Sequence, residues 1–117
     1  MSAKIALLSP ESEVSEKVIS LLNNVNLPIV SRMDDYSEII RNTDLIIRSG
    51  ASHALVAADF RTGIPYTQDG SRICSSLHAI SNIFLIGLSD HPLSHTMMNY
   101  GIRNLDSMIT FLVGWKS

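Results

Sequence analysis

Short apolar segments alternate with helical patterns along the chain, and this alternation constrains the fold more than any other feature. Five segments have the length and composition of buried strands: residues 4–8, 27–30, 45–47, 64–67 and 83–88. Helical patterns separate them, and a helical crossover joins strands that run parallel in one sheet. The sequence therefore predicts a parallel sheet covered by helices on both faces.

The predicted helices have recognisable starts, ends and apolar faces. They span residues from about 10 to 25, 36–41, 52–60, 73–80 and 105–113, with a short helical piece near 93–100. Asp35, followed by Glu38, predicts a capping box, and Asn42-Thr43 ends that helix. The side chains expected to face inward are Val14, Val18, Leu21, Leu22, Val25, Tyr36, Ile39, Ile40, Leu105, Ile109, Leu112 and Val113. We expect an α/β, flavodoxin-like three-layer sandwich with five parallel strands in the order 2-1-3-4-5.

Size and composition limit the classes of protein open to the chain. With 117 residues, 45% of them hydrophobic, it suits a single domain over residues 1–117. The net charge of −2 is dispersed, so the basic stripe of a nucleic-acid-binding protein is missing. The N-terminus lacks the apolar region of a signal peptide, and no apolar run is long enough to span a membrane. Together with the lone Cys74, these features predict a cytoplasmic protein with neither nucleic acid nor membrane as partner.

A small-residue turn, Ser49-Gly50-Ala51-Ser52, follows the predicted strand 45–47 and precedes a predicted helix. Such a turn offers backbone N–H groups and the positive end of a helix dipole to a phosphate or carboxylate. An ordinary helix cap explains the same residues without a ligand. Connectivity brings further polar residues to the same predicted sheet edge: Ser9, Glu11, Asp34, Arg48, Asp69, Asp90 and His91.

The chemistry of this predicted edge is weakly specified. Asp34, Asp69 and Asp90 could each supply a general base or a carboxylate nucleophile, although a solvated turn or cap acid is the more ordinary explanation of each. His91 and His95 have no acidic or cysteine partner at metal-binding spacing, so no metal site is predicted. Neither a P-loop nor a G-x-G-x-x-G motif follows the first strand, and no cofactor is predicted.

The order of segments resembles the nucleoside 2-deoxyribosyltransferase-like family. The similar segments are residues 4–10, 40–47, 62–65, 97–99 and 105–112. The resemblance implies a flavodoxin-like fold and a site for a nucleoside or nucleotide. The family's nucleophilic Glu lies on the helix after strand three, and Leu55 stands at that position here. The resemblance therefore implies a ligand-binding relative that has lost covalent catalysis.

A second resemblance is to the receiver domains of response regulators. Thr67 falls near the receiver's hydroxyl position, and His91-Pro92 stands where a Lys-Pro pair is expected. Pro10-Glu11 replaces most of the acidic pair after strand one, and Arg48-Ser49 occupies the phosphoacceptor region. This resemblance implies a degenerate receiver that acts through its surface as a dimerisation or docking module.

Two functions are therefore predicted. The first is binding of a nucleoside, nucleotide or related phosphorylated small molecule, and the alternative is a protein-interaction module without catalysis. The residues expected to bind the small molecule are Ser9, Arg48, Ser49, Gly50, Ser52, Asp69 and Asp90. The apolar tail, with Phe111 and Trp115, predicts a homo-oligomer under either function.

Overall fold

The computed structural model describes residues 2–9, 13–57, 67–80, 82–90 and 92–116, without the side chains of residues 36, 67–69 and 102. The strands are β1 (Ile5–Leu8), β2 (Ile29–Met33), β3 (His53–Ala57), β4 (Phe84–Leu88) and β5 (Met98–Tyr100). The helices are α1 (Glu13–Asn24), α2 (Tyr36–Arg41), α3 (Thr43–Arg48), α4 (Thr67–Ile80) and α5 (Leu105–Gly114), with a 3₁₀ turn over Ile102–Asn104. Among the described helices, none is long and apolar enough to cross a membrane.

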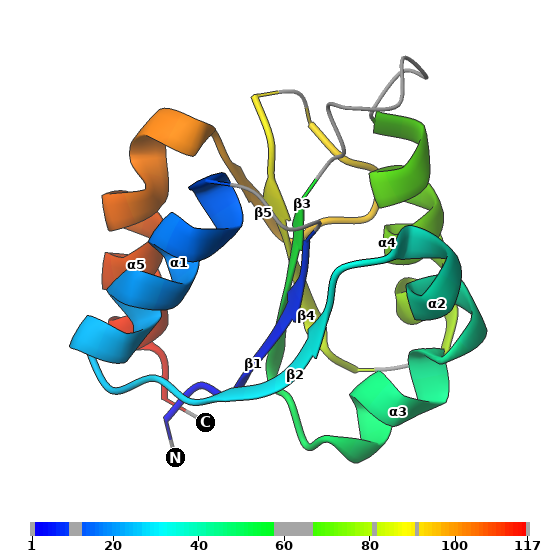
Figure 1. The fold of residues 1–117 in the computed structure, drawn as a ribbon, viewed down its shortest axis with the longest axis horizontal. Helices are drawn as coiled ribbons and strands as arrows, with labels where there is room; N and C mark the ends of the chain where they lie inside the picture. Colours follow the sequence, from blue (N-terminus) through cyan, green and yellow to red (C-terminus); the bar gives the residue numbers. More distant parts are fainter. Residues whose placement is uncertain (1, 10–12, 58–66, 81, 91, 117) are drawn as a thin grey trace.

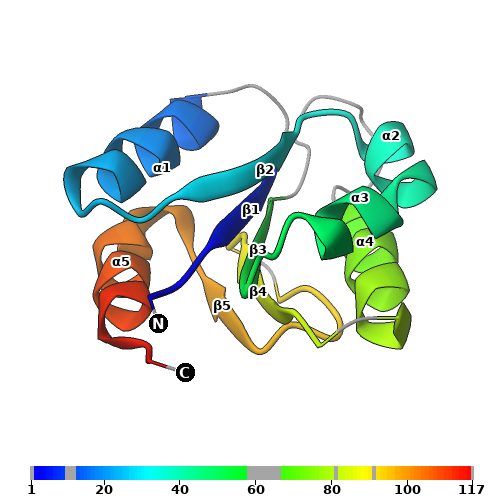
Figure 2. The same ribbon diagram turned by 90° about the horizontal axis from the view of Figure 1, so that it is seen from below.

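The five strands form one parallel sheet in the order β2-β1-β3-β4-β5, which confirms the predicted flavodoxin-like fold. Helices α1 and α5 cover one face, and α2, α3 and α4 cover the other (Figure 1). The carboxyl ends of the strands point toward the top of that view. Figure 2 shows both chain termini near the opposite edge of the sheet, beside α5.

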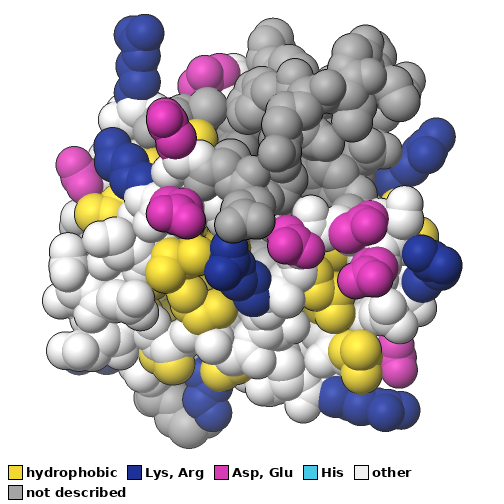
Figure 3. Space-filling model, viewed as in Figure 1, with side chains coloured by type: hydrophobic (Ala, Val, Ile, Leu, Met, Phe, Trp, Pro, Cys, Tyr) yellow, Lys and Arg dark blue, Asp and Glu magenta, His cyan; other side chains and the backbone are white. Residues whose placement is uncertain are grey.

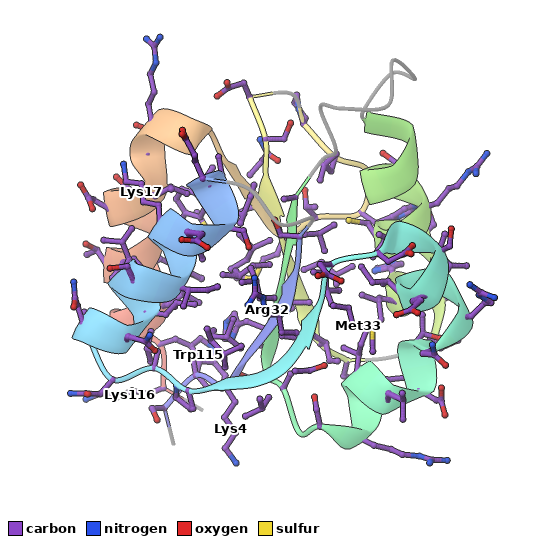
Figure 4. The ribbon with its side chains drawn as sticks, viewed as in Figure 1. Lys4, Lys17, Arg32, Met33, Trp115 and Lys116 are labelled. Atoms are coloured by element: carbon purple, nitrogen blue, oxygen red, sulfur yellow. The ribbon has the colours of Figure 1, made fainter. Side chains whose placement is uncertain are left out.

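Each face of the sheet has its own hydrophobic core. Leu7, Leu55 and Ile86 point toward α1 and α5, whereas Leu8 and Val56 point toward α2, α3 and α4. All five residues of the central strand β3 are buried, which is why its sequence lacks the polar alternation of a half-exposed strand. The edge strand β2 does alternate: Arg32 points outward and Met33 packs against the second core, on opposite sides of the strand (Figure 4).

The prediction of strand three at residues 45–47 is wrong, because these residues form the last turn of α3. Ile46 is buried there, while Leu45 and Ile47 are largely exposed, so only one side of this short helix packs against the core. The predicted helix 52–60 is wrong over residues 53–57, which form β3. Gly50, with φ +79°, ends α3 in the left-handed conformation and lets the chain turn into that strand.

Strands four and five of the sheet are also displaced from their predicted positions. Of the predicted strand 64–67, residues 64–66 lie outside the described residues and Thr67 begins α4. The segment 83–88, predicted as the fifth strand, forms β4. The predicted helical piece at 93–100 is wrong, because residues 98–100 form β5 and pair with residues 86–88 of β4.

Most predicted helix faces are confirmed, with errors at helix ends. Asp35 caps α2 by accepting a hydrogen bond from the Ser37 N–H at 2.8 Å. Val25, Ile40 and Val113 are exposed rather than inward, because they lie on or beyond the outer side of their helices. Five positions on α1 and α5 have no exposed surface, and two of them, Ser15 and Met108, were not predicted to face inward; the others are Val18, Leu22 and Leu112. On the face seen in Figure 3, acidic and basic side chains are interspersed, as the dispersed charge implies.

The connection between β4 and β5 contains no helix within its described residues. Leu93, which belongs to this connection, is nearly fully buried and packs against Gly70 of α4. The Asn99 amide lies over Gly87, where a Cβ would overlap its oxygen, and donates a hydrogen bond to the Ser89 carbonyl at 2.6 Å. The short connection therefore depends on side-chain packing and leaves β5 as an edge strand.

Candidate functional site

The carboxyl edge of the sheet is formed by residues that directly follow the strands. Ser9 follows β1, and its N–H donates to the Met33 carbonyl of β2 at 3.1 Å. Ser89 follows β4, and its N–H donates to the Tyr100 carbonyl of β5 at 3.1 Å. Both serines are buried, so the edge is closed by small polar residues that tie neighbouring strands together.

The described carboxylates at this edge are exposed and far apart. Asp34 follows β2, and Asp90 comes one residue after Ser89, with a carboxylate oxygen 2.7 Å from where a Cβ on Gly101 would lie. Because β1 and β3 separate β2 from β4, three strand spacings of about 4.8 Å place the two acids about 14 Å apart. Within the described part of the chain, no three His, Cys, Asp or Glu residues are grouped to hold a metal ion.

The predicted anion-binding turn lies at the opposite edge of the sheet, which corrects the predicted placement. Arg48, Ser49, Gly50 and Ser52 precede β3 rather than follow a strand. The Ser49 hydroxyl donates to the Ile46 carbonyl at 2.5 Å, which caps the carboxyl end of α3. That end carries the negative pole of the helix dipole, which opposes anion binding. Among these residues Arg48 pairs with Asp44 at 3.9 Å, an exposed pair one helical turn apart.

Three other residues from the sequence prediction are only partly located. Asp69 lies in the first turn of α4, with its side chain outside the described part of the structure. Glu11 and His91 lie outside the described residues altogether. The structure thus brings Ser9 and Asp90 to the carboxyl edge, together with Ser89, which the sequence prediction missed. The position of Ser89 directly after an apolar run in the sequence was the signal that could have placed it at this edge.

The amino edge of the sheet contains a feature that sequence reasoning also missed. His53, fully buried at the start of β3, lies in an aromatic cluster with ring centroids 4.8 Å from Trp115 and 5.2 Å from Phe84. Its Nδ1 is 2.8 Å from the Ser52 hydroxyl, while its Nε2 is buried without a hydrogen-bond partner. Trp115 and Lys4 lie at this end of the molecule in Figure 4. Burial lowers the pKa of His53, because desolvation disfavours the charged imidazole.

The lowered pKa of His53 predicts acid-sensitive stability. Below the unfolded-state pKa of about 6.5, His53 binds a proton in the unfolded chain and does not bind it in the folded chain. Stability therefore falls as the pH drops from about 6.5 to the lowered folded-state pKa, and His53→Leu should remove this part of the pH dependence. Urea unfolding at several pH values checks it, with exposed His78→Ala as the matched control. An unchanged pH slope in His53→Leu would contradict the assignment.

Comparisons with known proteins support the fold and little beyond it. No protein-family model matches the chain, and no curated protein matches it. Among solved structures, the fold is similar to the crystal structure of the receiver domain of a sensor histidine kinase from Pseudomonas aeruginosa, which has a magnesium ion in its active-site cleft. The TM-score is 0.63 at 11% sequence identity, covering 98% of this chain and 100% of that one. The chain therefore has the flavodoxin-like fold of a receiver domain.

Proposed function

We propose that this chain is a receiver-like protein-interaction module that does not accept phosphate and that pairs with a second copy of itself. The receiver likeness supports this alternative, and the comparisons lend no support to the resemblance to nucleoside 2-deoxyribosyltransferases or to nucleotide binding. Leu55, compared above with that family's nucleophile position, lies in the core of β3. The cytoplasmic location expected from the sequence belongs to the same proposal.

The residues after β1 support the loss of phosphate acceptance. A receiver places an acidic pair there, and this chain has the buried Ser9 followed in sequence by Pro10 and Glu11. The two described acids at the sheet edge, Asp34 and Asp90, are too far apart to replace that pair on one metal ion, since metal–oxygen bonds are only about 2.0–2.6 Å long. A site without paired carboxylates lacks the usual means of neutralising a transferred phosphoryl group.

The observed strand positions move the other receiver positions along the sequence. Since β3 ends at Ala57, the phosphoacceptor region begins at Ala58-Asp59, outside the described residues, rather than at Arg48-Ser49. The hydroxyl position after β4 falls on Ser89 rather than Thr67. Asp59 is therefore the residue to test for a second function, phosphoryl acceptance.

Incubation with acetyl phosphate and Mg²⁺ should leave the intact mass of the chain unchanged, because a strong metal site after β1 is not expected. Intact-mass spectrometry at neutral pH checks this prediction, with a phosphorylatable receiver treated in parallel as the positive control. A stable mass increase of one phosphoryl group, absent from Asp59→Asn, would instead establish the second function.

Exposed apolar side chains at an edge strand are the observation that carries the interaction part of the proposal. Met97, directly before β5, and Met98, the first residue of β5, are 47% and 39% exposed, and Phe84 of β4 is 41% exposed. Within the described residues β5 pairs only with β4, so its outer side can accept another strand. Two copies related by a two-fold axis would join these edges through one self-complementary patch. We therefore place the self-association surface at residues 97–100.

A further inference from the structure

Two histidine rings from separate parts of the chain lie face to face on the surface. His78 belongs to the last turn of α4, and His95 belongs to the connection between β4 and β5. Their ring centroids are 4.9 Å apart and their planes differ by 21°. Both side chains are exposed, so their nitrogens are accessible from solvent.

Hydrogen bonds on both sides of His95 hold the imidazole of this residue beside α4. His95 has φ +63°, a left-handed conformation that is uncommon for residues other than glycine, although histidine adopts it more often than most. On one side the Ser94 N–H donates to the Ser71 hydroxyl of α4 at 3.5 Å. On the other, the Thr96 hydroxyl donates to the Leu93 carbonyl at 2.9 Å, and Met97 N–H bonds the Leu85 carbonyl. The connection is therefore fastened to both α4 and β4 around His95.

The two rings border a surface hollow of about 350 Å³. Its lining contains no Lys, Arg, Asp or Glu among the described residues, so neither a competing cation nor a competing carboxylate faces the imidazoles. Met97 also lines the hollow and brings a thioether, a soft ligand, to the same place. Imidazole and thioether donors suit late transition metals and do not suit Mg²⁺ or Ca²⁺, which take oxygen ligands.

We propose that His78 and His95 form a surface site for a late first-row transition-metal ion, with Cu²⁺ bound most tightly and Zn²⁺ more weakly. Copper stands highest among divalent ions for nitrogen ligands. Two protein nitrogens leave the remaining coordination positions to water or to the Met97 thioether. Both histidine ligands belong to one chain, so metal binding does not require self-association, and Met97 lies both in the hollow and in the proposed self-association surface.

The separation of the rings fits this assignment. Two metal–imidazole bonds of about 2.0–2.1 Å require the ligating nitrogens to lie within about 4 Å of each other. Rings with centroids 4.9 Å apart meet that limit once both exposed side chains turn out of their nearly parallel stack, because a metal ion lies in the plane of each imidazole that binds it. Protons compete with the metal ion for the imidazole nitrogens, so affinity should fall at acidic pH.

Isothermal titration of the untagged chain with Cu²⁺ at pH 7.5 tests the proposal. We expect one ion per chain, with affinity at least tenfold lower in His78→Ala and in His95→Ala, and lower again for the wild type at pH 5.5. Zn²⁺ should bind the same chain more weakly. Both substituted positions are exposed, and circular dichroism verifies that each variant is folded.

His91→Ala is the matched control, because it removes the histidine four positions before His95 in the sequence, outside the proposed pair. Retained Cu²⁺ affinity in His91→Ala, together with reduced Cu²⁺ affinity in His78→Ala and in His95→Ala, supports the proposed metal site. Unchanged affinity in both His78→Ala and His95→Ala, or loss in His91→Ala alone, overturns it. Electron paramagnetic resonance of the Cu²⁺ complex should show nitrogen couplings in the wild type that are reduced when either ring is removed.

Discussion

Leu55→Ala is expected to lower the free energy of unfolding by about 2–5 kcal/mol, because it leaves a cavity under the central strand. Leu55 is fully buried in β3 and packs in the core beneath α1 and α5. Leu45→Ala, the matched control, should change stability by less than about 0.5 kcal/mol, because Leu45 is 48% exposed on α3. The pair of variants removes the same atoms from a strand and from a helix surface.

Urea unfolding followed by circular dichroism measures both variants against the wild type. The comparison is sharp because the sequence prediction expects the reverse arrangement: Leu45 in a buried strand and Leu55 in a covering helix. A large loss of stability in Leu45→Ala with a small one in Leu55→Ala would restore the predicted arrangement and contradict the observed strand β3.

The sequence was sufficient to predict the fold class and the strand order, although three of the five strands were assigned to the wrong segments. The strand order depends on how many crossover connections the chain makes. Assigning a strand to the segment of a neighbouring helix, and the helix to the segment of the strand, does not change that number. Residues 45–47 and 53–57 are both short apolar runs, and periodicity does not separate a short helix from a buried strand. The glycine at position 50, read as a ligand turn, was the signal for the end of α3.

The candidate site was less predictable than the fold, because it depends on where each strand ends. Ser9 and Asp90 follow segments whose strand character was evident in the sequence, and both lie at the carboxyl edge. Ser49 and Ser52 moved to the amino edge when the strand after them proved to be β3. The contact of His78 with His95 was not visible in the sequence, since 17 positions and the whole of strand β4 separate the two residues along the chain.

Met98→Asp is expected to weaken self-association by at least tenfold, which corresponds to about 1.4 kcal/mol. The carboxylate would be desolvated at the paired β5 edges, and the two copies of the charge, brought close across the two-fold axis, would repel each other. Met98 is partly exposed in the single chain, so the variant should retain the stability of the wild type. Leu45→Asp places the same charge on the distant surface of α3 and should leave self-association unchanged.

Sedimentation velocity over a range of concentrations tests the central claim, that the chain is an interaction module that uses its β5 edge, most directly. The account predicts a concentration-dependent dimer for the wild type and for Leu45→Asp, and a monomer for Met98→Asp at the same concentrations. A wild-type chain that stays monomeric throughout, or a Met98→Asp variant that dimerises as strongly as the wild type, would contradict it.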